Sequence, residues 1–109
     1  MDIKRAEKVL QSIGNVTRIK IFKLLVEYNK VGLCSTGIAK ELNIPQNTIS
    51  FHLSNMKNAD LLTSTKEGKN VIYTINKSTF DGLQNFLFKN CCIRDNRICD
   101  CKLNNNGGN

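Results

Sequence analysis

The stretch of sequence that decides the fold is residues 35–59, STGIAKELNIPQNTISFHLSNMKNA. It contains two segments with apolar residues at helical spacing, separated by Asn43-Ile44-Pro45. Proline suits the first turn of a helix, where its missing N–H is not needed, so Pro45 is expected to open a helix that runs to about Ala59. Two helices joined by three or four residues form a helix-turn-helix.

The same stretch also predicts the N-cap residue of the first helix and the core-facing residues of both helices. Ser35 or Thr36 is expected to cap the first helix, because a hydroxyl accepts a hydrogen bond from the free amides of the first turn. The residues expected to face the core are Ile38, Ala39 and Leu42 in the first helix and Ile49, Leu53 and Met56 in the second.

After the helix-turn-helix the sequence changes to strand character. Residues 61–65 and 71–75 are rich in β-branched side chains, and Glu67-Gly68-Lys69-Asn70 between them is typical of a turn. The pattern predicts a basic β-hairpin, or wing, directly after the second helix.

Three further helices complete the chain. The first is predicted over residues 3–13, the second from residue 16 to about 28, and the last, capped by Asn76 or Ser78, to about Asn90. The fold class is mainly α with a two-stranded β-wing (α+β), in the order α-α-α-α-β-β-α. The inward residues are expected to be Ile3, Ala6, Leu10 and Ile13 in the first helix, Val16, Ile19, Phe22, Leu25 and Val26 in the second, and Phe80, Leu83, Phe86 and Leu87 in the last.

Length and composition exclude several classes of function. The 109 residues suffice for about one domain, and a single histidine, His52, excludes most His-dependent catalytic sites. The formal charge of +7, of which residues 1–90 carry +6, favours an anionic partner. No apolar stretch approaches the roughly 18 residues of a membrane span and the start is charged, so we expect a cytoplasmic protein that is neither an enzyme nor bound to a membrane.

The outer face of the second helix-turn-helix helix suits DNA. It is polar and uncharged; Asn and Gln can make paired contacts with adenine, and Ser or Thr can reach bases or phosphates. Phe51 either contacts a thymine methyl or is partly buried, and His52 either packs beneath the helices or contacts a phosphate. A polar helix face is also the ordinary solvated side of a helix. The candidate DNA-binding residues are Gln46, Asn47, Thr48, Ser50, Phe51, His52, Ser54, Lys57, Lys66 and Lys69, with Lys40 as a further source of charge.

Four of the five cysteines lie in residues 91–101, CCIRDNRICDC. In a reducing compartment such cysteines are more often metal ligands or redox sensors than disulfides. Thiolates select soft acceptors such as Cu(I), Zn and, by the same softness, trivalent arsenic or antimony. Zinc usually takes ligands from a Cys-x-x-Cys loop, and this run does not contain one. A pyramidal trivalent ion needs three sulfurs, which a vicinal pair and a third cysteine brought back by a short loop can supply. An exposed thiol cluster without function is the alternative.

Three segments of the chain resemble the ArsR/SmtB family of winged-helix metalloregulatory repressors. They are GNVTRIKIFKLL at 14–25, TISFHL at 48–53 and EGKNVIY at 67–73, and the resemblance extends over about residues 5–88. It implies a homodimer joined through the first and last helices, bound to double-stranded operator DNA and released when an effector ion binds. Many members carry arginine where this chain has Phe51.

The resemblance also bears on the effector site. Arsenic-responsive members often use Leu-Cys-x-Cys-Asp-Leu, of which LCSTGI at 33–38 keeps only Cys34, and a zinc site needs histidines that the last helix lacks. Another arsenic-responsive branch has a vicinal pair after the last helix and a third cysteine beyond, similar to Cys91, Cys92 and Cys99. These three are the expected ligands, with Cys101 as a substitute or additional one. Cys34 is expected to be a buried small apolar residue rather than a ligand.

These observations predict a DNA-binding domain over residues 1–90, a cysteine-rich effector-binding tail over 91–101 and a disordered C-terminus over 102–109. The expected function is a repressor that senses As(III) or Sb(III) as its effector, without an organic cofactor. A repressor that responds to a thiol oxidant, a persulfide, Cu(I), Cd(II) or Pb(II) is the alternative. A thiol–disulfide or metal-carrier protein is a more distant one, because it leaves the wing and the helix-turn-helix unexplained.

Overall fold

The structure is a computed structural model that describes residues 1–94 and 97–98. The observed element order confirms the predicted α-α-α-α-β-β-α winged helix-turn-helix. The elements are α1 (Ile3–Ile13), α2 (Val16–Glu27), α3 (Ser35–Leu42), α4 (Gln46–Asn58), β1 (Leu62–Glu67), β2 (Asn70–Ile75) and α5 (Lys77–Phe88).

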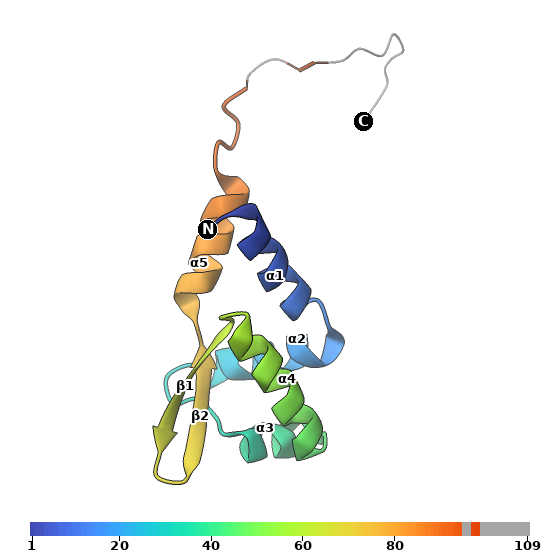
Figure 1. The fold of residues 1–109 in the computed structure, drawn as a ribbon, viewed down its shortest axis with the longest axis vertical. Coiled ribbons are helices and arrows are strands. Elements are labelled where there is room, and N and C mark those ends of the chain that lie inside the picture. The colour runs from blue at the N-terminus through green and yellow to red at the C-terminus, as the bar shows by residue number, and fades with distance from the viewer. Residues whose placement is uncertain (95–96, 99–109) are drawn as a thin grey trace.

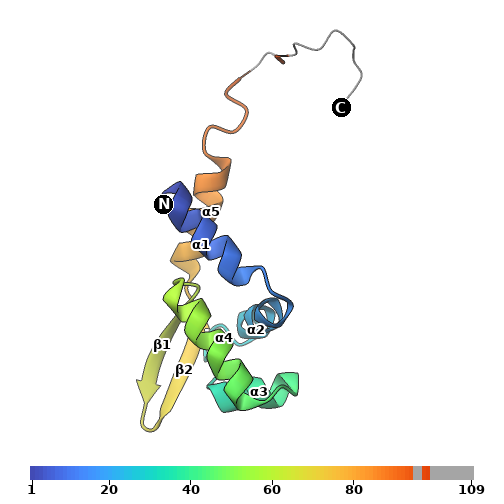
Figure 2. The ribbon, with the colours of Figure 1, turned by 45° about the vertical axis from the view of Figure 1, so that its right-hand side comes forward.

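The helices divide the molecule into two ends. α1 and α5 lie beside each other at one end, whereas α3, the start of α4 and the tip of the hairpin lie at the other (Figures 1 and 2). Apolar side chains from most elements meet between these ends in one core. Its largest fully buried members are Val9, Ile21, Leu25, Ile38, Ile49, Leu53, Met56 and Leu61, which include four of the six inward residues predicted for the helix-turn-helix.

The helix-turn-helix forms as predicted, with different caps. α3 ends at Asn43, whose left-handed conformation (φ 56°) is one that asparagine tolerates, and Pro45 is the N-cap residue of α4 rather than its first helical residue. The prediction that Ser35 or Thr36 caps α3 is wrong, because Cys34 occupies the N-cap position and makes no side-chain capping bond. The Thr36 hydroxyl lies 3.0 Å from Cys34 Sγ instead.

The wing is a two-stranded antiparallel hairpin. Its register runs from the pair Leu62–Ile75 to the pair Glu67–Asn70, so the turn is the two residues Gly68 and Lys69. Leu33, which precedes α3, exchanges two backbone hydrogen bonds with Tyr73 (3.1 and 2.8 Å) and so fastens the hairpin to the helix-turn-helix.

The approach of Leu33 to β2 depends on Gly32. Its φ is +73°, and a Cβ atom there would lie 2.6 Å from Ile72 Cγ2 and 2.7 Å from the Tyr73 carbonyl oxygen. We expect Gly32→Ala to lower the free energy of unfolding by more than the roughly 1–3 kcal/mol of left-handed strain alone. Gly68→Ala is the matched control, since its φ is +61° with no atom within 4 Å of the added Cβ. Urea denaturation of both variants measures the difference, and equal losses would contradict the steric argument.

α1 buries a different face from the predicted one. Ala6, Val9 and Ser12 are buried, whereas Ile3 is 74% exposed and Leu10 is 45% exposed. The apolar residues of α1 cover two adjacent faces, and only one of them packs on α2 and α4 in the single chain.

The buried faces of α2 and α5 also differ from the predicted ones. α2 is apolar on most sides, so periodicity alone does not select the buried one. α5 ends at Phe88, two residues before the predicted end. The buried residues are Ile21, Leu24 and Leu25 in α2 and Thr79 and Leu83 in α5, whereas Val16, Ile19, Val26 and Leu87 are exposed, contrary to the prediction.

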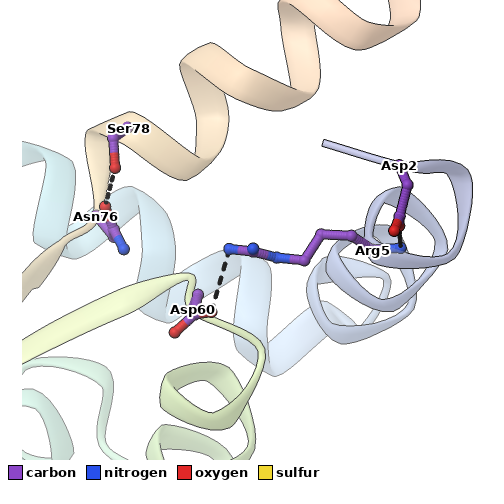
Figure 3. A network of polar contacts seen from close by, with 5 residues as sticks. All are labelled: Asp2, Arg5, Asp60, Asn76 and Ser78. Carbon is purple, nitrogen blue, oxygen red and sulfur yellow. Dashed lines mark hydrogen bonds and ion pairs between the residues drawn. The ribbon is translucent and has the colours of Figure 1, made fainter.

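Polar contacts fix the starts of α1 and α5 (Figure 3). Asp2 Oδ1 accepts a 2.7 Å hydrogen bond from the Arg5 amide as the N-cap of α1, and the Arg5 guanidinium donates to Asp60 at 3.1 Å. Asn76, one of the two predicted caps, occupies the N-cap position of α5 but makes no side-chain capping bond; its side-chain oxygen accepts instead from the Ser78 hydroxyl at 2.8 Å. In the part of the chain that the structure describes, no helix is long and apolar enough to cross a membrane.

Candidate nucleic-acid interface and cysteine pair

α4 presents the polar face that the sequence predicts for a DNA-reading helix. Ile49, Leu53 and Met56 are fully buried and hold α4 on the core. The opposite side is free of charged residues from Gln46 to Met56. The structure places Gln46, Asn47, Thr48, Ser50, Phe51 and Ser54 on the surface and leaves His52 half-buried.

The amides at the start of α4 already have partners within the chain. Gln46 Nε2 donates a 3.2 Å hydrogen bond to Ser35 Oγ, which joins α4 to the start of α3. Asn47 Oδ1 accepts from the Thr48 amide at 2.9 Å, so its Nδ2 group is the part that points to other partners. Both side chains are exposed, and their held positions suit contacts with base edges.

The positive charge lies at the end of α4 and on the elements packed against it, α3 and the hairpin. Lys57 is in the last turn of α4 and Lys40 in the last turn of α3. Lys66 lies on β1 and Lys69 in the wing turn, and all four side chains are exposed. Exposed lysines at the end of α4 and on the neighbouring elements are suited to phosphates, which position a protein on DNA without reading its sequence.

A polar network behind α4 was not predicted from the sequence. Arg18 Nε donates to His52 Nδ1 at 3.1 Å, and Arg18 Nη1 donates to the Ser12 carbonyl oxygen at 3.3 Å. Ser12 Oγ also donates to Asn55 Oδ1 at 2.7 Å, so the end of α1, the start of α2 and α4 are joined. The available signal was a serine on the buried face of α1, which needs a polar partner. His52 thus faces the body of the protein with Nδ1 already engaged.

This network makes stability depend on pH. Burial lowers the pKa of His52 below its usual value, and the Arg18 guanidinium lowers it further. The unfolded chain, with a histidine pKa of about 6.5, then binds the proton more readily than the folded one. The stabilisation from His52 is therefore complete above about pH 7 and is lost as the pH falls through 6.5 towards the folded pKa.

We expect His52→Gln to show a smaller loss of unfolding free energy between pH 7.5 and pH 5.5 than the original chain. Glutamine keeps a hydrogen-bond acceptor for Arg18 but does not titrate, and this chain has no second histidine. Urea denaturation at the two pH values gives the comparison. An equal loss in both proteins would mean that other groups carry the pH dependence.

The vicinal cysteines lie directly after α5 and are exposed. Their sulfur atoms are 3.4 Å apart, and both thiols are free. Asn90 and Cys92 both have left-handed backbone conformations (φ 65° and 62°), so the chain turns sharply here. Two sulfurs bound to one ion at about 2.3 Å, the usual Zn–S length, lie at most about 4.6 Å apart. The two sulfurs are therefore close enough to bind the same soft ion.

The structure does not describe the other ligands predicted in the cysteine-rich tail. Cys99 and Cys101 lie outside the described residues, as does the expected disordered segment 102–109. Among the residues that the structure describes, no three histidine, cysteine or acidic side chains gather as a metal site.

Cys34 differs from its prediction as a buried apolar residue. It is half-buried, and the hydrogen bond with the Thr36 hydroxyl, followed by a backbone hydrogen bond from Gly37, lowers its pKa although burial opposes this. Cys34 is the N-cap residue of α3, and α3 lies at the opposite end of the molecule from the end of α5, after which Cys91 and Cys92 follow (Figure 1).

Comparison with known proteins agrees with this arrangement. A model of bacterial regulatory proteins of the arsR family matches residues 15–64. An HTH-type transcriptional regulator of Methanocaldococcus jannaschii is 38% identical over 60% of this chain and 71% of its own. The transcriptional repressor SdpR of Bacillus subtilis is 31% identical over 72% and 84%, and the arsenical resistance operon repressor of Staphylococcus aureus is 26% identical over 94% and 93%.

Solved structures share the fold. An ArsR family transcriptional regulator superposes with a TM-score of 0.72 at 14% identity, over 90% of this chain and 98% of its own. The transcriptional repressor PagR of Bacillus anthracis gives 0.65 at 27% identity, over 78% and 94%. These relatives are named as regulators rather than enzymes. The chain belongs to the arsR family of DNA-binding transcriptional regulators.

Proposed function

We propose that this regulator is a homodimeric repressor that senses As(III) or Sb(III) through Cys91, Cys92 and Cys99 and leaves its operator when the ion binds. The observation that carries the proposal is the exposed pair of free sulfurs, 3.4 Å apart, directly after the last helix. Three thiolates suit a soft, pyramidal ion. Cys101 is the substitute for Cys99 as the third ligand. The match to a named arsenical repressor over nearly the whole chain supports the same effector.

The apolar surface of α1 and α5 supports the dimer. The two helices border a groove of about 680 Å³, lined by Ile3, Leu10, Phe86 and Leu87 among others. Phe88 at the end of α5 is also exposed. A second copy of the chain placed on this surface would bury these side chains. A winged helix-turn-helix domain from Mycobacterium bovis, 20% identical with a TM-score of 0.65, is described as homodimeric, which supports a dimer of this chain.

The position of the cysteine pair suggests how binding reaches DNA. The pair follows α5, and α5 borders the proposed dimer surface, so an ion that reorders the end of α5 acts on the subunit contact. A changed contact alters the distance between the two α4 helices, which must match half-sites about one turn of DNA apart. A coupling of about 1–3 kcal/mol weakens operator binding roughly 5- to 150-fold.

Titration of the reduced full chain with arsenite tests the proposal. The chain is bound to a fluorescent palindromic duplex, and anisotropy is followed together with the sulfur-to-ion absorbance. We expect both signals to change together and to saturate at one ion per subunit. Absorbance without release would show ion binding that does not regulate, and no response at all would overturn the arsenic assignment.

Parallel titrations separate the alternative signals. The exposed reduced pair can also bind Cu(I), Cd(II) or Pb(II), be oxidised to a disulfide, or accept a sulfane sulfur from a low-molecular-weight persulfide, which leaves as the thiol. If one of these agents releases the DNA at a lower concentration than arsenite does, that agent is the effector. The proposal that the protein is a repressor would then stand.

A further inference from the structure

We propose that Phe51 reads the methyl group of a thymine in the major groove, so that each operator half-site carries a T·A pair beneath it. The inference rests on the proposed DNA binding by α4 and names what that helix recognises. It starts from an apolar ring where the rest of the surface is polar.

Phe51 is 66% exposed in the middle of the reading face. The structure describes all of α4, and among its residues Phe51 is the one large apolar side chain that is exposed. Its neighbours one helical turn away on the surface are Asn47 and Ser54. A large apolar ring exposed to water in such surroundings is typical of a contact surface, and here the surrounding lysines favour DNA as the partner.

The ring is held in place from behind. Phe51 packs edge-on against the His52 imidazole, with ring centroids 5.4 Å apart and an interplanar angle of 70°. His52 is fixed in turn by the hydrogen bond from Arg18 Nε, and Arg18 is tied to the Ser12 carbonyl oxygen. This contact orients the Phe51 ring from one side, and a side chain that is already oriented loses less freedom when it binds.

The chemistry of the major groove selects thymine. Thymine is the base that presents a methyl group there, and apolar side chains including phenylalanine contact it. The commonest guanine contact needs a paired Arg or Lys, and residues 46–56 of α4 contain neither. The amides of Gln46 and Asn47 suit adenine instead. The face therefore reads A·T pairs, with Phe51 distinguishing the thymine side.

Removal of single methyl groups from the DNA tests the inference. Duplexes bound by the full chain are first selected from a random pool, and each thymine of a selected duplex is then replaced by deoxyuridine. We expect one thymine in each half-site at which the replacement weakens binding about fourfold, the value of one buried methyl group, with the two effects multiplying.

Two variants assign the effect to the ring. Phe51→Ala should bind thymine and uracil duplexes equally and still fold, because the side chain is exposed. Val31→Ala, which shortens an exposed apolar residue outside α4, should keep the preference for thymine.

The outcomes separate this inference from the proposed function. If salt-sensitive binding persists but uracil equals thymine at every position, or if Phe51→Ala still prefers thymine, the inference is overturned and DNA binding stands. If no duplex is enriched from the pool, DNA binding by α4 fails, and the inference fails with it.

Discussion

Replacing both Cys91 and Cys92 with serine is expected to abolish arsenite-driven release, raising the arsenite concentration needed by more than about 100-fold. The pair supplies two of the three proposed sulfur ligands. Linking several ligands in one chain raises the affinity for the ion by about 10²–10⁴ over that of a single ligand. Operator affinity without arsenite should stay within about twofold, because both side chains are exposed and lie at the opposite end of the molecule from α3 and the start of α4. Anisotropy of a fluorescent duplex measures both quantities.

Cys34→Ser is the matched control for this double variant. Hydrogen bonds from Thr36 and Gly37 lower the pKa of the Cys34 thiol, but Cys34 is the N-cap residue of α3, which lies at the other end of the molecule from the end of α5. We expect its replacement to leave the release unchanged. If Cys34→Ser removes the arsenite response and the double variant keeps it, the sensor is at α3 and the proposed site is wrong.

The helix-turn-helix and the wing could be predicted because their signals are local. Pro45 marks the start of α4 within one residue, and Gly68 supplies the positive φ of the wing turn. The inward residues of α4 follow from helical spacing alone, since one side of that helix is polar. Each of these features depends on residues a few positions apart, which periodicity and turn chemistry describe well.

The buried faces of α1 and α2 could not be predicted in the same way. Both helices carry apolar residues on more than one face, and a periodic pattern does not show which face meets the core of its own chain. Leu10 and Val9 illustrate this, because the sequence favours Leu10 as the inward residue and the structure buries Val9. The exposed face is then available to a second chain.

The chemistry of the candidate site could be predicted from the sequence, but the polar contacts that hold its side chains in place could not. The composition of α4 and the cysteine run indicated DNA reading and soft-ion binding. The bond from Arg18 to His52 spans 34 positions of sequence, and no local pattern encodes a polar contact of that range. Of the two readings of His52 that the sequence left open, this bond favours packing against the body of the protein.

Replacing Leu10 with glutamate is expected to produce a monomer and to lower operator affinity by at least about 100-fold. In a twofold interface the same residue occurs on both subunits, so one substitution buries two unpaired carboxylates, each costing several kcal/mol. A monomer holds one half-site and loses the gain of about 10²–10⁴ that two linked reading helices provide. The monomer itself should fold, because Leu10 is already 45% exposed in the single chain.

Sedimentation at micromolar concentration and circular dichroism distinguish dissociation from unfolding. Val31→Glu gives the same charge change on an exposed apolar residue that does not line the groove between α1 and α5, and should remain dimeric. A Leu10→Glu protein that stays a dimer would remove α1 from the interface. The same substitution at the exposed Val26 of α2 would then test whether a second copy covers that helix instead. In that case the route from the cysteine pair through α5 to the spacing of the two α4 helices would fail as well, because that route requires α5 and its neighbour α1 to form the contact between subunits.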